Sequence, residues 1–229
     1  MCGRAYETYT EDELYLRYLT EGAKRSPLGF KANYNLAPTQ LSPVVVNRTG
    51  SPEIVLLRWG LVPSWAKDLQ SASKYSLINA RGEEILEKRS YKDPFLRRRC
   101  IVPLSGFFEW KRESEKSKRP FAIHLKGEPI MSVAGVWEHW VSPVTGEIVD
   151  SFSVITTAAN SMMETIHDRM PVILSKNTEA EWLDPKNQDP VLLKKLLKPC
   201  PSEWLEAHEI SSAVNSPKNN SPELLSPIR

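Results

Sequence analysis

Cysteine is scarce in this sequence of 229 residues, which contains only Cys2, Cys100 and Cys200. Their number is odd and no two form a C-x-x-C pair, which argues against a disulfide framework and against a zinc knuckle. We expect Cys100 and Cys200 to be inert. No other pattern indicates a metal or an organic cofactor, so the sequence predicts that the protein works without either.

Long hydrophobic runs are also absent. No segment approaches the ~18 apolar residues of a membrane span, and the first residues have neither the basic region nor the apolar core of a signal peptide. The composition, 41% hydrophobic and 25% charged, is that of an ordinary globular protein. We therefore expect a cytoplasmic protein with no membrane partner, and no motif indicates a particular protein partner.

The net charge is small, at +2, and falls short of the strongly basic signature of a dedicated nucleic-acid binder. The charge is nevertheless uneven, because residues 88–99 carry a net +5 and residues 111–119 a net +3, which leaves −6 for the rest of the chain. These segments are either a basic face for phosphates or two solvated loops, and the pattern alone leaves both interpretations open.

The hydrophobic pattern is mostly that of strands in succession. The strand-like segments are residues 43–47, 53–60, 121–126, 129–137 and 151–158. Because they do not alternate with long helices, we predict an α+β fold: a curved, mainly antiparallel, barrel-like β-sheet with flanking short helices. We expect a single domain at residues 2–212, followed by a loose Ser-, Pro- and Asn-rich tail at residues 213–229.

The expected helices are short and peripheral. Thr10 and Glu13 make a capping box at the start of the first helix, and Gly22 is its expected stop. Ser161 and Glu164 make a second capping box. The other expected helices are residues 81–89, 177–183 and 189–198, the last capped by Asp189.

The first candidate site is the start of the chain, MCGR. Removal of Met1 is expected before a residue as small as cysteine, and it leaves Cys2 with a free α-amine and a thiol, whose ordinary pKa values are roughly 7.7–8.0 and ~8.5. Such a residue can attack an amide, with its amine as the base for its thiol. It can also condense with an aldehyde, the amine forming an imine and the thiol closing a thiazolidine ring. The alternative is that a cysteine at this position is incidental.

The second candidate is SLINAR, which follows the Trp-bearing loop RWGLVPSWAKD. Asn79 offers a donor and an acceptor, Arg81 offers a planar fork suited to phosphate, and Trp65 can stack against bases. The alternative is that the tryptophans belong to the core and that Asn79 caps a turn.

The third candidate is LSGFFEWK, in which a carboxylate interrupts an aromatic run. If this segment is a strand, Glu109 shares a face with Phe107, and Phe108 shares the other face with Trp110. Burial there raises the pKa of Glu109 and keeps it protonated as a proton donor. The alternative is an edge-strand glutamate paired with Lys111 or Arg112.

The fourth candidate is IHDRMP, where a short helix gives way to an extended residue before Pro171. His167 titrates near neutral pH and can shuttle a proton or contact a phosphate, with Asp168 or Arg169 to orient it. A lone histidine in a loop is, however, more often structural or solvated.

Together and in this order, the motifs resemble those of one family. MCGR, YNLAP, RWGLVPSWA, INAR, GFFEW and HDRMP are similar to the motifs of the SRAP (SOS response-associated peptidase) family of abasic-site processing proteins. The resemblance covers residues 2 to about 175. It implies a curved, mainly antiparallel sheet with flanking helices, single-stranded DNA containing abasic sites as the partner, and a role in the DNA damage response.

The resemblance also implies roles for individual residues. Cys2 is the nucleophile, and its amine and thiol together form a thiazolidine with the ring-opened abasic deoxyribose. Asn79 hydrogen-bonds the terminus and the sugar, while Glu109 assists ring opening and proton transfer. His167 contacts the sugar phosphate and moves protons. The implied DNA contacts are Arg4, Asn35, Arg81 and Arg169 to phosphates and Trp65 as a wedge against bases.

Three hypotheses follow from these residues. The first is a protein that crosslinks itself to abasic sites, with a weak lyase activity from the imine and an autoproteolytic activity behind the family's peptidase label. The second is a cysteine amidohydrolase or peptidase that uses Cys2 as an N-terminal nucleophile without DNA. The third is a non-catalytic binder of single strands in which Cys2 is irrelevant. The combination of motifs favours the first.

Overall fold

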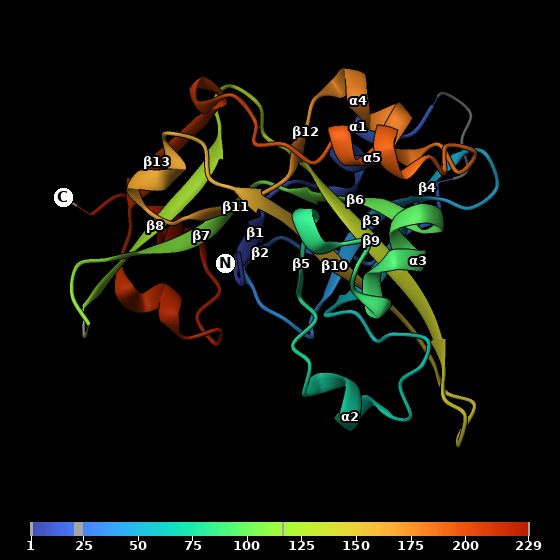
Figure 1. The fold of residues 1–229 in the computed structure, drawn as a ribbon. Helices are drawn as coiled ribbons and strands as arrows, with labels where there is room; N and C mark the ends of the chain where they lie inside the picture. Colours follow the sequence, from blue (N-terminus) through green and yellow to red (C-terminus); the bar gives the residue numbers. More distant parts are fainter. Residues whose placement is uncertain (1, 21–24, 116, 229) are drawn as a thin grey trace.

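The computed structural model describes residues 2–20, 25–115 and 117–228, and its strands form two sheets. The smaller sheet has five strands in the order β13-β8-β7-β1-β2, each antiparallel to its neighbours (Figure 1). Its members are β1 (Ala5–Glu7), β2 (Asn33–Leu36), β7 (Gly106–Arg112), β8 (Lys118–Leu125) and β13 (Leu205–Glu209).

The larger sheet closes into a five-stranded barrel, because the path β10-β4-β3-β6-β9 returns to β10. Only the β4–β10 contact in this ring is parallel. The ring strands are β3 (Leu41–Asn47), β4 (Pro52–Trp59), β6 (Arg99–Leu104), β9 (Met131–Val141) and β10 (Ile148–Ala158). Three short strands join its margins: β5 (Asn79–Arg81), β11 (Arg169–Pro171) and β12 (Ile173–Leu174). The predicted α+β fold with a curved, mainly antiparallel, barrel-like sheet is confirmed.

The barrel strands bury both of their faces, which explains why they are continuous apolar runs. In β3, Val44 and Val46 pack into one core cluster with Trp59, whereas Val45 packs into a second cluster with Phe95. This is the two-residue alternation of a strand between two apolar layers.

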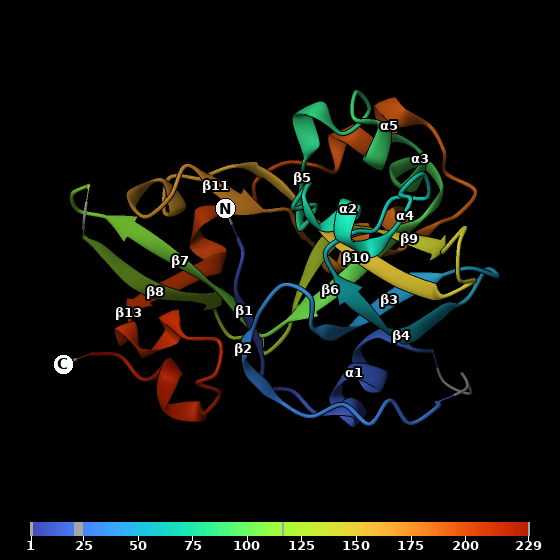
Figure 2. The same cartoon turned by 90° about the horizontal axis from the view of Figure 1, so that it is seen from below.

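The helices lie around the barrel (Figures 1 and 2), and all but the short helix at residues 69–73 bury apolar side chains in its second cluster. That helix instead buries Ala72 in a separate cluster with Trp140. They are α1 (Glu11–Tyr18), α2 (Leu69–Ser73), α3 (Arg89–Arg97), α4 (Lys176–Leu183) and α5 (Pro190–Lys195). The predicted capping box of α1 is confirmed, as is the Asp189 cap of α5, while Gly22 lies outside the described residues. Among the helices of the described residues, none is both long and apolar enough to cross a membrane.

Two helix predictions are wrong. Residues 81–89 form only a 3-10 turn, η1 (Gly82–Glu84), because Arg81 is the end of β5 and pairs with Thr156 of β10; the α-helix begins at Arg89. The segment 161–166 holds a 3-10 turn, η2 (Met163–Thr165), without the expected capping box. The Met163 amide instead donates to Oδ1 of Asn160 at 2.9 Å, at the start of this turn.

The C-terminal segment packs against the smaller sheet and is not the loose coil that its composition suggests. It contains two 3-10 turns, η4 (Ser212–Asn215) and η5 (Pro222–Leu225), which bury Val214 and Leu224. Ile210 and Pro227 form an isolated bridge. Polar residues alone indicated coil, but a few apolar anchors hold this segment in place.

Candidate functional site

Cys2 lies just before β1 and is buried, with 1% of its surface exposed. The side-chain amide of Asn79, the first residue of β5, donates to the Cys2 carbonyl oxygen at 2.8 Å. The other side-chain atom of Asn79, Oδ1, is buried and has no hydrogen-bond partner among the described residues. The site therefore holds the backbone of Cys2 and presents an unused acceptor close to it.

Glu109 lies on β7 and is 3% exposed. Phe107 belongs to the core cluster that contains Cys2, whereas Phe108 and Trp110 pack together in a separate cluster, so the predicted division of faces is confirmed. Burial raises the pKa of Glu109, and the opposing effect of His167 is weaker. Burial, and next the charge of Glu109, raise the pKa of the Cys2 thiol.

His167 lies in the loop before β11, with its Nε2 atom 4.0 Å from Oε2 of Glu109. Its other ring nitrogen, Nδ1, accepts the backbone amide of Arg169 at 3.0 Å. A neutral ring with this bond carries its proton on Nε2, the nitrogen that faces Glu109. Nδ1 is also 2.9 Å from Oδ1 of Asp168, which accepts a hydrogen bond from Nδ1 when that nitrogen carries a proton.

The fold thus brings the four residues predicted to be catalytic to one place. They come from the N-terminus, from β5, from β7 and from the loop that precedes β11. A thiol, an amide, a buried carboxyl and an imidazole together can form a covalent bond to an electrophile and move the protons that this requires.

Two of the predicted DNA contacts, Arg4 and Asn35, bind within the protein. Arg4 donates to Asn35 Oδ1 at 2.7 Å and to the Val214 carbonyl at 2.8 Å. Asn35 is 1% exposed, and its Nδ2 donates to three carbonyls of the C-terminal segment, those of Val214, Ser216 and Asn219. Both side chains therefore anchor this segment close to Cys2.

Trp65 and Arg81 line a cavity of about 400 Å³ that also reaches Asn79. Trp65 meets the Tyr75 ring edge-on at 5.4 Å between centroids, and the Arg89 guanidinium lies 5.3 Å from its ring centroid. The Arg81 side chain is 55% exposed. Tyr75 and Arg89 were not predicted as site residues. The only sequence feature that pointed to either of them is that Arg89 belongs to the basic segment 88–99.

Arg169 is held by an acid that the sequence analysis missed. Its two terminal nitrogens donate to both carboxylate oxygens of Glu83 at 2.8 and 2.9 Å, and one of them also donates to the Thr156 carbonyl at 2.9 Å. The Arg169 side chain is only 13% exposed. No local motif marks Glu83, because its partner is far away in the sequence.

Several arginines of the two basic segments are held by contacts within the protein. Arg99 is buried and donates to five backbone carbonyl oxygens. Arg98 pairs with Asp93 and Glu138. In the second segment, Arg119 pairs with Glu113 and Glu209. Residues 88–99 are therefore mostly a helix and a buried strand start, and neither a continuous basic face nor a solvated loop describes them.

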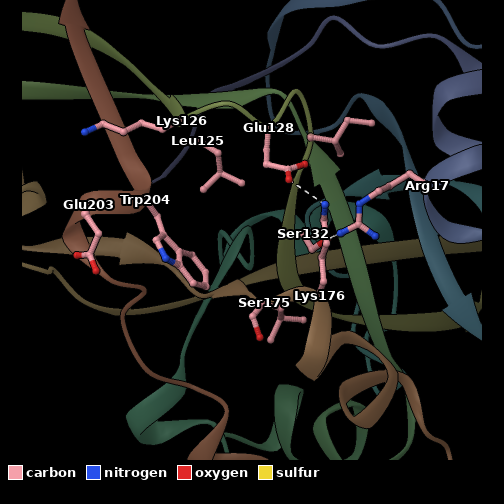
Figure 3. A pocket seen from close by; sticks show the side chains of 11 residues that line it. Arg17, Leu125, Lys126, Glu128, Ser132, Ser175, Lys176, Glu203 and Trp204 are labelled. Atoms are coloured by element: carbon pink, nitrogen blue, oxygen red, sulfur yellow. Dashed lines mark hydrogen bonds and ion pairs between the residues drawn. The ribbon is translucent and has the colours of Figure 1, made fainter.

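A separate cavity of about 360 Å³ lies where the β8–β9 turn meets the start of α4 (Figure 3). Leu125, Ile130, Leu174 and Trp204 give it an apolar lining, and Lys176 and Glu128 form an ion pair of 2.8 Å at its edge. None of the predicted site residues is among those that line it. Within the described part of the chain, no three His, Cys, Asp or Glu side chains are grouped so that they could hold a metal ion.

Comparison with known sequences places this site in a family. The SOS response associated peptidase (SRAP) family matches residues 1–217. The chain is 43% identical over 230 residues to the abasic site processing protein YoqW of Bacillus subtilis (strain 168), covering 98% of this chain and 99% of that protein. It is 33% identical over 228 residues to the abasic site processing protein HMCES of Gallus gallus, covering 87% of this chain and 67% of that protein.

Solved structures agree with this placement. A protein from Bacteroides thetaiotaomicron superposes with a TM-score of 0.88 at 29% identity, over 100% of both chains. A phage-related protein from Bordetella bronchiseptica shares the fold, with a TM-score of 0.70 at 22% identity over 91% of this chain and 94% of that one. The chain belongs to the SRAP family.

Proposed function

We propose that this protein binds single-stranded DNA at abasic sites and attaches itself covalently through Cys2, as part of the DNA damage response in the cytoplasm and at the nucleoid. The observation that carries the proposal is the hydrogen bond of 2.8 Å that holds the Cys2 carbonyl, beside the buried Glu109 and its neighbour His167. Family membership and the names of the relatives support the abasic site as the substrate.

The proposed reaction balances without any other reactant. After removal of Met1, the Cys2 amine attacks C1′ of the open-chain aldehyde, and the resulting carbinolamine loses water to give an imine. The thiol then adds to the imine carbon, and its proton ends on the nitrogen. The product is a five-membered thiazolidine, and one water is released. Both nucleophiles are on one residue, which makes the ring closure intramolecular.

Glu109 and His167 move the protons in this scheme. Burial raises the pKa of Glu109 and so favours its protonated form, which can protonate the sugar ring oxygen and the departing hydroxyl. His167, with Nε2 directed at Glu109, returns or removes that proton. The pKa of the Cys2 thiol is raised, so the thiol enters protonated and needs this base.

Asn79 holds the nucleophile in this scheme. Its Nδ2 fixes the Cys2 carbonyl, and its unused Oδ1 accepts from the Cys2 amine or from a sugar hydroxyl. The exposed Arg81 contacts a phosphate, and Trp65 stands against the neighbouring base in the adjoining cavity. Arg4, Asn35 and Arg169 already bind within the protein, so we place them behind this contact surface.

The imine intermediate accounts for a minor lyase activity. A protonated imine at C1′ makes the C2′ hydrogen acidic, so loss of that proton can expel the 3′ phosphate by β-elimination. Closure of the thiazolidine removes the imine and protects the strand. Self-cleavage next to Cys2 by the same groups is the corresponding proposal for a peptidase activity.

The experiment is a denaturing gel of the processed protein with a single-stranded oligonucleotide that carries one abasic site, without borohydride. Mass spectrometry first confirms that Cys2 is the terminus. The expected result is a heat-stable shifted band, absent for Cys2→Ala and for an intact oligonucleotide, with intact-strand binding by Cys2→Ala retained. Absence of the band from the wild-type protein overturns the proposal. Turnover of peptides or amides without DNA then supports the amidohydrolase hypothesis.

A further inference from the structure

Glu83 connects the two strands that carry Asn79 and the residues next to His167. It lies in η1, immediately after β5. Its carboxylate accepts hydrogen bonds from both terminal nitrogens of Arg169, at 2.8 and 2.9 Å. A bidentate pair of this kind fixes distance and orientation together. The hydrogen bonds from Arg169 also lower the pKa of Glu83, so its carboxyl stays ionised near neutral pH.

β10 lies between these two strands. Its residue Thr156 pairs with Arg81 of β5 on one side and with Pro171 of β11 on the other. The Arg169 guanidinium reaches across β10. It donates hydrogen bonds to Glu83 on the β5 side and, at 2.9 Å, to the Thr156 carbonyl of β10 itself. The pair therefore fixes the separation of β5 and β11 where the site is built.

The backbone of Arg169 is the part that contacts the catalytic imidazole. Its amide donates to His167 Nδ1 at 3.0 Å and so favours the neutral ring with its proton on Nε2, 4.0 Å from Glu109. The Asp168 carboxylate, 2.9 Å from Nδ1, favours the opposite placement of the proton, so the position of the Arg169 amide decides between the two. Movement of Arg169 would thus change which nitrogen carries the proton and where that nitrogen points.

We propose that Glu83 is a positioning residue for the reaction at Cys2: through Arg169 it sets the tautomer and the place of His167 relative to Asn79. This inference rests on the proposed function. Glu83 does not contact the reacting atoms. It is 51% exposed at its side chain, so a change there does not open the core.

The test measures the rate of crosslink formation against the concentration of abasic oligonucleotide for the wild type, Glu83→Gln, Glu83→Asp and Glu87→Gln. Glu87→Gln is the matched control, because it removes the same charge from an exposed residue of the following turn. We expect the maximal rate constant to fall roughly 10- to 100-fold in Glu83→Gln at an unchanged half-saturating DNA concentration. Glu83→Asp, which keeps the charge, recovers part of the rate. Thermal unfolding of each variant shows that it is folded.

The pH dependence of the crosslinking rate gives a second readout. A variant that is only less stable should keep the shape of the wild-type pH–rate profile. In Glu83→Gln we expect a pH–rate profile of altered shape, because the neutral tautomer of His167 is no longer fixed. A wild-type rate and profile in Glu83→Gln overturn the inference. A lower half-saturating concentration with an unchanged maximal rate also overturns it, since Glu83 then only competes with phosphate for Arg169. If the wild type itself forms no crosslink, the proposed function fails and not only the role of Glu83.

Discussion

The side-chain amide of Asn79 donates a hydrogen bond of 2.8 Å to the carbonyl oxygen of Cys2. Asn79 is itself fixed by β5, whose register places it opposite Val154 of β10. Cys2, although it lies next to the start of the chain, where residues are often free to move, is therefore held to the barrel by this amide.

Replacement of Asn79 by alanine should slow crosslink formation. Loss of this bond costs about 1–2 kcal/mol in the placement of Cys2, which corresponds to a rate roughly 5- to 30-fold lower. Binding to an intact single strand should change little. The measurement is the single-turnover rate on a gel, with Asn177→Ala on the exposed face of α4 as the control. A wild-type rate in Asn79→Ala would show that the bond does not position Cys2.

The buried carboxyl of Glu7 should make the stability of the fold depend on pH. Glu7 is 0% exposed on β1, and burial raises its pKa from 4.5 to about 8. Because the folded state holds the proton more tightly, this contribution is fully present below about pH 4.5 and is lost as pH rises towards 8. We expect the free energy of unfolding to fall by on the order of 1 kcal/mol per pH unit between these values.

Urea unfolding at pH 5.5, 6.5 and 7.5 measures this slope. Glu7→Gln, which is neutral at every pH, should flatten it, whereas Glu181→Gln on α4 should leave it unchanged. If the slope in Glu7→Gln equals that of the wild type, another group carries the pH dependence.

The stability of the barrel should depend on the planar shape of the Arg99 guanidinium as well as on its charge. Its guanidinium donates to five backbone carbonyls, those of Phe95, Leu96, Trp182, Asp184 and Asn187. Lysine has three donors and no planar fork, so Arg99→Lys leaves buried carbonyls without partners. We expect the free energy of unfolding to drop by about 2–4 kcal/mol in urea titrations. Arg97→Lys, whose side chain is 65% exposed, should cost far less.

Removal of residues 213–229 should weaken the domain. The truncation takes away all three carbonyls that bind the Asn35 amide and exposes apolar surface that Val214 and Leu224 cover. A loss of about 2–4 kcal/mol in the free energy of unfolding is expected. Lys218→Ala in the full-length chain is the control. An unchanged stability after truncation would instead support a domain that ends at residue 212.

The parts of the fold that follow local rules could be predicted. The strands showed as apolar or alternating runs, and Thr10 with Glu13 marked the start of α1. The helix expected at residues 81–89 failed because pairing of Arg81 with Thr156, far away in the sequence, overrides the local helical pattern. The charge pattern did not predict that Arg99 is buried, for a similar reason. Nothing next to Arg99 in the sequence shows that backbone carbonyls surround it in the fold.

The residues of the candidate site also divide into those that a local motif marks and those that only the folded chain brings together. Cys2, Asn79, Glu109 and His167 could be predicted as candidates because each stands in a distinctive motif, and the structure places them close together. Glu83 was missed because only the folded chain brings it to Arg169. Asn35 was expected to face DNA, but an amide surrounded by three carbonyls cannot be recognised from its neighbours in the sequence.

The candidate catalytic residues are spread from position 2 to position 167, on elements that meet only through long-range strand pairing. Contacts of this kind form late in folding, because distant parts of the chain must first be brought together. In the proposed reaction, a nascent or partly unfolded copy would offer the Cys2 amine and thiol but lack the acid, the amide and the imidazole around them. Under the proposed function, Glu109, Asn79 and His167 can therefore assist the reaction of Cys2 only in the completely folded chain.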